Sequence, residues 1–522
     1  MSWQPPYRSS NFRHMYAKPA PKEHCYSGLP ITRSVHDNAF CSVNPRFIAV
    51  VTECTGGGAF LIISIHHTGR VDPQHARVCG HEGKVLDVKW DPFSDLRIAS
   101  CSEDCTVKVW NIPPQGVRNN LTTPLKELRG HTRRVGLIEW HPTARDILFS
   151  SAYDCKVLVW RLDVCECVCC RPVRVIDSHT EVLLSLSFNT DGSRLATACR
   201  DKSVRVIHTH TGELLQQGSV NSHRPTKVVF VGDLNLLIST GVSCWNQRQI
   251  TVWNPADLSE PLLEEDLDGD AGVLFPFYDP DTHLLYLAGK GDGNIRCFEL
   301  SAEEPYLHFT AEYRSPLPQK SMAVMPKRGL DLSDCEVFRF YRLVGIKNLV
   351  EPVSLIVPRK SDGFQDDLFP PTAANEAAMS AAEWIQGHTR GPVLMSLKPG
   401  AEVENPYPAP EPRLSKHQNP SPPPSAANQA EEQRPGDPSD LSDWQEDDTH
   451  ASSPCPHVTR SPLQWCESPV YTPPSPDDQL LVVFYRQCEE LRILKAELQE
   501  KDERISRLQQ QITQQCDIPA PH

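Results

Sequence analysis

Residues 80–110 read GHEGKVLDVKWDPFSDLRIASCSEDCTVKVW, and residues 130–160 repeat the pattern as GHTRRVGLIEWHPTARDILFSSAYDCKVLVW. In both copies a His lies 29 residues before the final Trp, and an Asp lies 6 residues before it. Three unlike residue types that keep one spacing through both copies indicate a structural repeat. The fold must therefore be built by stacking such units against one another.

The spacing is that of a WD40 blade, a four-stranded unit that buries its faces only against neighbouring blades. We expect the His near the start of the innermost strand, the Asp in the turn between the second and third strands, and the Trp at the end of the third. A Ser four residues before each Asp would complete a buried hydrogen-bonded chain from Trp through Ser and His to Asp. The predicted chains consist of His81, Ser100, Asp104 and Trp110 in the first copy and His131, Ser150, Asp154 and Trp160 in the second.

A third copy of the repeat is incomplete. It keeps His179, Thr197 and Asp201 but has Ile207 where the Trp is expected. Isoleucine offers no N–H group, so we expect this blade's network to be one member short.

Further blades carry fewer of the signature residues. One is predicted from His223 to Trp253 and another around Asp292. At roughly 45 residues per blade, the chain from about residue 8 to residue 350 holds seven blades. We place the remaining two before His81 and in residues 305–350, the latter closed by an N-terminal strand. The predicted fold class is all-β, with a seven-bladed propeller over residues 1–350.

The chain contains 19 cysteines but no run of 18 apolar residues and no secretion signal at its start. We therefore expect a cytosolic protein with reduced thiols and no transmembrane segment. Cys165, Cys167, Cys169 and Cys170 form the densest cluster. Tetrahedral zinc needs ligand pairs from separate parts of the chain, so we predict a structural cluster, no metal site and no cofactor.

Residues 401–478 differ sharply from the repeats. They contain fourteen acidic and four basic residues, which accounts for most of the chain's net charge of −14, and they are rich in proline. Such a segment cannot bury enough apolar surface to fold, so we predict a disordered linker. Candidate sites for proline-directed kinases are Ser421, Ser453, Ser461, Ser468, Thr472 and Ser475. Ser-Pro pairs are also common in unmodified linkers, and this alternative stays open.

Residues 479–516 show a heptad pattern that predicts a terminal α-helical coiled coil. The seam consists of Phe484, Leu491, Leu494, Leu498, Ile505, Leu508 and Ile512. Gln487 and Lys501 interrupt it, so the helix should be of modest stability. We expect a homo-oligomer, a trimer or a tetramer; the alternative is that the helix docks on its own propeller.

Several segments outside the repeat resemble the short coronins, and most of all their second class. These segments are residues 7–14 (YRSSNFRH), 56–60 (GGGAF), 272–279 (GVLFPFYD), 289–296 (GKGDGNIR), 325–331 (MPKRGLD) and 351–359 (EPVSLIVPR). The resemblance implies a seven-bladed propeller, an extension over residues 351–400 packed across one face, and oligomerisation through the tail.

The resemblance also implies a function. Coronins bind filamentous actin and modulate filament branching and turnover, with the branching complex and the filament-severing factor as partners. The implied location is the cytoplasm and its cytoskeleton, and a nuclear pool stays open. No nucleic-acid partner is expected.

Filaments are acidic, so the contact should come from clustered bases. The candidate actin-binding residues are Arg8, Arg13, His14, Lys18, Lys22, Arg33, Lys327 and Arg328. The alternative is that the first five belong to an ordinary solvated N-terminus. First-class coronins carry an arginine implicated in filament binding at the position that matches Pro30, and proline brings neither charge nor donor. The propeller should then bind weakly, and oligomerisation should matter more.

An enzyme is not expected. The chain lacks the GxxxxGK[ST] loop, the HExxH motif and a nucleophile elbow. The alternative to an actin-binding scaffold is a WD40 adaptor of another multiprotein assembly, such as a nuclear regulatory complex, because propellers serve many unrelated partners.

Overall fold

The computed structural model describes residues 10–54, 57–163, 169–219, 223–270, 272–361 and 363–401. These residues belong to the first of two compact units, Met1–Lys416 and His417–His522. The predicted linker and coiled coil, at 401–478 and 479–516, lie outside the described residues, apart from Ala401.

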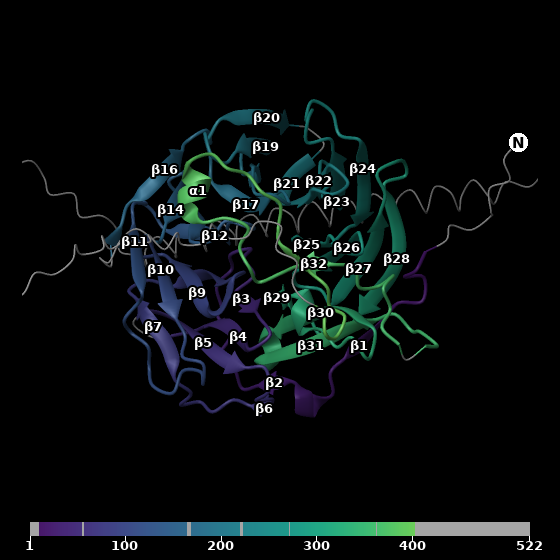
Figure 1. The fold of residues 1–522 in the computed structure, drawn as a ribbon, viewed down its shortest axis with the longest axis horizontal. Helices are drawn as coiled ribbons and strands as arrows, with labels where there is room; N and C mark the ends of the chain where they lie inside the picture. The colour runs from purple at the N-terminus through teal and green to yellow at the C-terminus, as the bar shows by residue number, and fades with distance from the viewer. Residues whose placement is uncertain are drawn as a thin grey trace, which may run out of the picture. The chain divides into compact units, whose positions relative to one another are not determined.

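Seven main sheets are arranged in a ring (Figure 1). The first blade contains β3 (Cys41–Val43), β4 (Phe47–Thr52), β5 (Gly58–Ser64) and β7 (Arg77–His81). The second contains β8 (Val85–Asp91), β9 (Ser94–Ser102), β10 (Thr106–Asn111) and β11 (Lys126–Arg129), with β15 (Cys169–Cys170) at its edge. The third contains β12 (Val135–Trp140), β13 (Ile147–Ala152), β14 (Val157–Arg161) and β16 (Pro172–Ile176).

The remaining blades continue around the ring. The fourth contains β17 (Leu183–Phe188), β18 (Arg194–Cys199), β19 (Ser203–His208) and β20 (Leu214–Ser219). The fifth contains β21 (His223–Val231), β22 (Leu236–Ser243), β23 (Arg248–Trp253) and β24 (Leu263–Asp268), and the sixth β25 (Leu274–Asp279), β26 (Leu284–Gly289), β27 (Asn294–Leu300) and β28 (Leu307–Arg314). The seventh contains β29 (Ser321–Val324), β30 (Glu336–Val344) and β31 (Leu349–Ile356), to which β1 (Tyr16–Pro19), β2 (Tyr26–Ser27) and β6 (Gly69–Arg70) are added. The predicted all-β, seven-bladed propeller is confirmed.

The seventh blade closes the ring by joining the two ends of the propeller sequence. Both β1 and β2 pair antiparallel with β31, and Tyr16 lies opposite Ile356. The N-terminal strand that the sequence predicted is thus present. Because β31 must extend to Ile356 to supply this edge, the predicted propeller boundary at residue 350 lies inside a strand and moves to residue 356.

The hydrophobic core lies between adjacent blades. All six residues of β4 are buried, because both faces of its sheet are covered by other parts of the protein. Trp110 of the second blade is fully buried, and its ring meets Phe60 of the first blade edge-on at 6.2 Å. β4 is accordingly apolar at its first five residues rather than alternating, and each blade depends on its neighbours for burial.

The extension after β31 returns across the ring. It includes β32 (Thr372–Ala373), α1 (Ala381–Ile385) and β33 (Leu394–Met395), and α1 lies over the third blade (Figure 1). Ser380 and Glu383 form a capping box that starts the helix. The indole of Trp384 is buried against His141 and Phe149, with ring centroids at 5.6 and 6.1 Å. An apolar anchor therefore attaches the extension to the propeller.

Candidate functional sites

The first polar chain joins two blades. Trp110 Nε1 donates to Ser100 Oγ at 2.8 Å, Ser100 Oγ lies 2.8 Å from His81 Nε2, and His81 Nδ1 lies 2.8 Å from Asp104 Oδ2. His81 is the last residue of β7 in the first blade, whereas its partners belong to the second. The His was expected at the start of the innermost strand. It lies instead on the outer strand of the preceding blade, because it pairs there with Gly58.

Hydrogen bonds keep the Asp104 carboxylate of this network ionised. Burial alone would raise the pKa of Asp104, but hydrogen bonds from His81 and Thr106 hold it well below its usual range. The carboxylate is thus a fixed structural charge at the junction.

The second chain has the same geometry at the next junction. Trp160 Nε1 donates to Ser150 Oγ at 2.8 Å, His131 Nε2 lies 2.8 Å from the same oxygen, and His131 Nδ1 lies 3.0 Å from Asp154. His131 lies between β11 and β12, in the connection from the second blade to the third.

The third chain is shorter than expected. His179 Nε2 lies 3.0 Å from Thr197 Oγ1, but His179 Nδ1 has no hydrogen-bond partner among the described residues. Asp201 does not reach His179; its Oδ2 accepts from Arg205 at 2.6 Å. The network of the third blade therefore lacks Asp201 as well as the Trp. Asp201 pairs with Arg205 because a charged guanidinium is a stronger partner for a carboxylate than a neutral imidazole.

The junction between the fifth and sixth blades uses an ion cluster that sequence reasoning missed. The side chain of Arg248 is 1% exposed and lies 2.6 Å from Asp268 and 2.5 Å from Asp292. Burial alone would raise the pKa of Asp268, but hydrogen bonds from Arg248 and Arg296 lower it to about 2. Asp292 lies in the turn between the second and third strands of its blade, as Asp104 does in its own blade. This position was the only sign of the ion cluster in the sequence.

The candidate actin-binding bases do not form one patch. Arg13, His14, Lys18 and Lys22 are exposed on and beside β1, and Lys18 Nζ forms an exposed ion pair with Asp334 at 3.4 Å. Lys18 pairs with Ser354 near one end of β31, whereas the segment leading to Arg33 passes the other end, where Leu29 N donates to the carbonyl of Asn348, the residue before the strand. Six residues of strand separate these points, a distance of about 20 Å. Arg8 lies outside the described residues.

Lys327 and Arg328 are occupied by structural ion pairs. They lie in η2 (Lys327–Gly329), where Lys327 Nζ is 2.5 Å from Asp279 and Arg328 is 2.6 Å from Asp95. Both side chains are at most 16% exposed, so their charges attach η2 to the sixth and second blades rather than facing solvent.

The predicted cysteine cluster lies partly outside the described residues. Cys170 is buried, Cys169 precedes it in β15, and Cys165 and Cys167 are not among the described residues. Among residues with a described placement, no group of three His, Cys, Asp or Glu side chains could hold a metal ion. In the same ranges no helix is long and apolar enough to cross a membrane.

The chain is similar to coronins over nearly its whole length. It is 52% identical to Coronin-2A from Homo sapiens over 519 residues, covering 98% of each chain, and 51% identical to human Coronin-2B over 517 residues, covering 98% of this chain and 96% of that one. Among solved structures, the WD40 domain from Toxoplasma gondii coronin matches 74% of this chain and 98% of its own, with 27% identity and a TM-score of 0.68.

Family models match individual segments. The model described as a WD domain, G-beta repeat, matches residues 73–111, 122–161 and 170–208. A further type of WD40 repeat matches residues 350–392, and a domain of unknown function, DUF1899, matches residues 6–70.

Proposed function

The chain belongs to the coronin family, and on that premise we propose that it is an actin-filament-binding scaffold that modulates the organisation and turnover of the actin cytoskeleton. The observation that carries the proposal is the alignment with Coronin-2A, which covers 98% of each chain. A propeller fold alone would not support a function, because propellers bind many partners. Similarity that also spans the extension and the tail does support one. The proposal assigns the chain no catalytic role.

The filament contact is proposed at the exposed bases beside β1. Arg13, His14, Lys18 and Lys22 form a basic edge on the seventh blade, and the filament surface is acidic. Arg33 would make a separate contact at the other end of β31. Lys327 and Arg328 are left out of the contact, because their charges are neutralised by Asp279 and Asp95.

Oligomerisation is proposed to strengthen a weak single contact. Pro30 supplies neither charge nor N–H, and its carbonyl already accepts from Glu53 N at 2.8 Å. Joining three or four propellers through residues 479–516 would raise the apparent affinity by roughly two to four orders of magnitude where the geometry allows. In the cytoplasm, such an oligomer could engage a filament together with the branching complex or the severing factor.

Co-sedimentation with actin filaments across a salt series tests this function. Binding should fall steeply as salt rises, because screening weakens exposed charge contacts. The double variant Arg13→Glu/Lys18→Glu should reproduce that fall at low salt, whereas the matched control Lys84→Glu/Lys156→Glu should bind like the wild type. A chain ending at Gln479 should also bind less while melting at the same temperature.

Two outcomes would contradict the proposal. Wild-type binding by the Arg13→Glu/Lys18→Glu variant would place the contact elsewhere on the propeller. Failure of the unmodified chain to sediment with filaments, together with recovery of a different assembly in a pull-down, would favour the adaptor function.

A further inference from the structure

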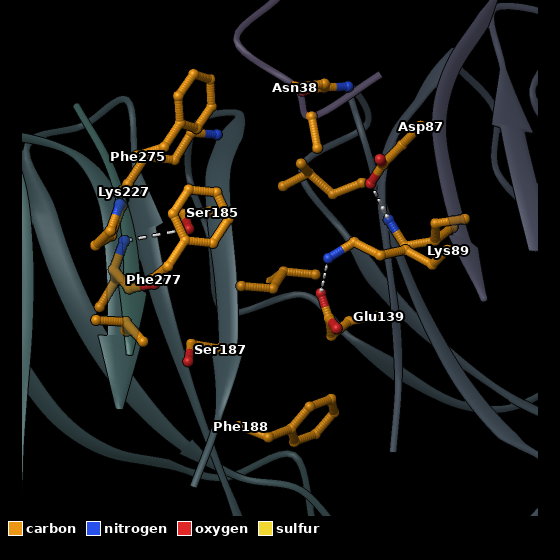
Figure 2. A pocket seen from close by; sticks show the side chains of 17 residues that line it. Asn38, Asp87, Lys89, Glu139, Ser185, Ser187, Phe188, Lys227, Phe275 and Phe277 are labelled. Atoms are coloured by element: carbon orange, nitrogen blue, oxygen red, sulfur yellow. Dashed lines mark hydrogen bonds and ion pairs between the residues drawn. The ribbon is translucent and has the colours of Figure 1, made fainter. Parts of the chain in front are cut away.

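A cavity of about 370 Å³ lies at the axis of the ring. It is lined by the innermost strands of five blades, β8, β12, β17, β21 and β25. Lys227, Phe275 and Phe277 lie on one side, and Asp87, Lys89 and Glu139 lie on the other (Figure 2). Its volume is in the range of pockets that hold small molecules, and it combines apolar walls with a few charged groups, as such pockets do.

On the side of the cavity that carries Asp87, Lys89 and Glu139, the charged groups have partners within the protein. Lys89 Nζ lies 2.9 Å from Glu139 Oε2, which forms an ion pair. Asp87 is buried and accepts from the backbone N–H of Val88 at 3.0 Å. Burial raises the pKa of Asp87 to about 6, which is still below physiological pH, so most of its carboxyl is ionised there.

Lys227 on the first side has no such partner. The residue is 8% exposed, and its Nζ donates to the carbonyl of Leu184 at 2.8 Å and lies 5.6 Å from the centre of the Phe275 ring. An ammonium has three donors, and none forms an ion pair with a carboxylate among the described residues. Burial lowers the pKa of Lys227 to about 8, so most of the side chain is still charged at neutral pH.

A buried cation without a carboxylate at ion-pair distance is unfavourable, and an anion in the cavity would relieve this cost. The ligand should carry a single negative charge, because Asp87 and Glu139 across the cavity would repel a second. Its remaining body should be apolar, because Phe275 and Phe277 form the wall beside Lys227.

We propose that the axial cavity binds a small monocarboxylate with an apolar body, whose carboxylate pairs with the Lys227 ammonium and whose body packs against Phe275 and Phe277. The site is separate from the basic edge on the seventh blade and does not depend on actin binding.

Isothermal titration calorimetry of the full chain tests the proposal, with benzoate as the probe. Benzoate should bind saturably with one site per chain. Benzyl alcohol, which lacks the charge, and inorganic phosphate, which carries more charge and no apolar body, should each bind at least about tenfold more weakly. Lys227→Met should lower benzoate affinity by more than about tenfold, since it removes one partner of a buried charge pair. Lys84→Met, which removes an exposed ammonium, should leave the affinity unchanged.

A second measurement uses the unaltered protein, in case Lys227→Met folds poorly. Benzoate should protect Lys227 from reductive methylation, read by peptide mass spectrometry, while Lys84 in the same sample reacts at its original rate. Absence of saturable benzoate binding, equal binding of phosphate, or methylation of Lys227 that benzoate does not slow would each overturn the proposal.

Discussion

Two junctions between blades each hold the carboxylate of a blade turn, but the group that holds it differs. Between the first and second blades, Asp104 in a blade turn is held by His81 in a chain of hydrogen bonds that ends at Trp110. Between the fifth and sixth blades, Asp292 in the equivalent turn is held by the buried guanidinium of Arg248. The comparison teaches that a junction needs a partner for its buried turn carboxylate, and that the partner can be an imidazole or an arginine.

The ion cluster should be the more sensitive of the two junctions. Arg248→Met leaves Asp268 and Asp292 without their shared cation, and breaking a buried ion pair costs about 3–5 kcal/mol. Urea denaturation of the full chain should show a loss of this size. Arg118→Met, at an exposed position, should change stability by less than about 0.5 kcal/mol. A loss no larger than in this control would show that the cluster does not stabilise the junction.

The incomplete junction at His179 should make stability depend on pH. Burial and the charge of Arg205 lower the pKa of His179 from 6.5 to about 4. Between pH 6.5 and pH 4, His179 binds a proton in the unfolded chain but stays neutral in the folded chain. The contribution of His179 to the free energy of unfolding is therefore complete above pH 6.5 and is lost as the pH falls toward 4. The loss should approach roughly 3 kcal/mol.

Denaturation midpoints between pH 7 and pH 4 measure this effect in the wild type and in His179→Gln. The variant should have a flatter profile, although His141, whose pKa burial lowers to about 3, keeps part of the slope. His14→Gln, which removes an exposed imidazole, is the control. Equal slopes in the wild type and His179→Gln would contradict the expectation.

The smallest expected loss of stability comes from breaking a hydrogen-bonded chain, and it should be larger for the complete chain at Ser100 than for the incomplete chain at Thr197. Ser100→Ala removes the oxygen shared by Trp110 and His81 and leaves buried polar groups unsatisfied, which costs about 1–3 kcal/mol. Thr197→Val removes only the bond to His179, so its loss should be smaller. Melting temperatures of both variants provide the comparison, and a larger loss for Thr197→Val would reverse the proposed ranking of the junctions.

The sequence predicted the propeller well because its signal is local and repeated. The spacing of His, Asp and Trp follows from strand and turn lengths within one blade, and the number of blades follows from the length of the repeat region. The N-terminal strand that closes the seventh blade was also predicted, although the propeller extends six residues further than expected, to Ile356.

The candidate sites were less predictable, because neighbours in sequence need not be neighbours on a surface. Arg13 and Arg33 are both exposed bases near the N-terminus, yet the chain between them runs along β31 and separates them. Lys327 and Arg328 also read as surface bases, but Asp279 and Asp95 pair with them from distant strands.

The sequence by itself determined the type of blade and the number of blades, since these depend on spacing and length along the chain. Only the tertiary structure decided that His81 bridges two blades, that Asp201 turns to Arg205, and that Lys227 faces the axis without a carboxylate partner among the described residues. These outcomes depend on which side chains from non-adjacent strands meet in a buried space. In a buried space the side chains form the strongest ion pairs and hydrogen bonds available to them. The spacing of residues along the chain does not predict which pairs these are.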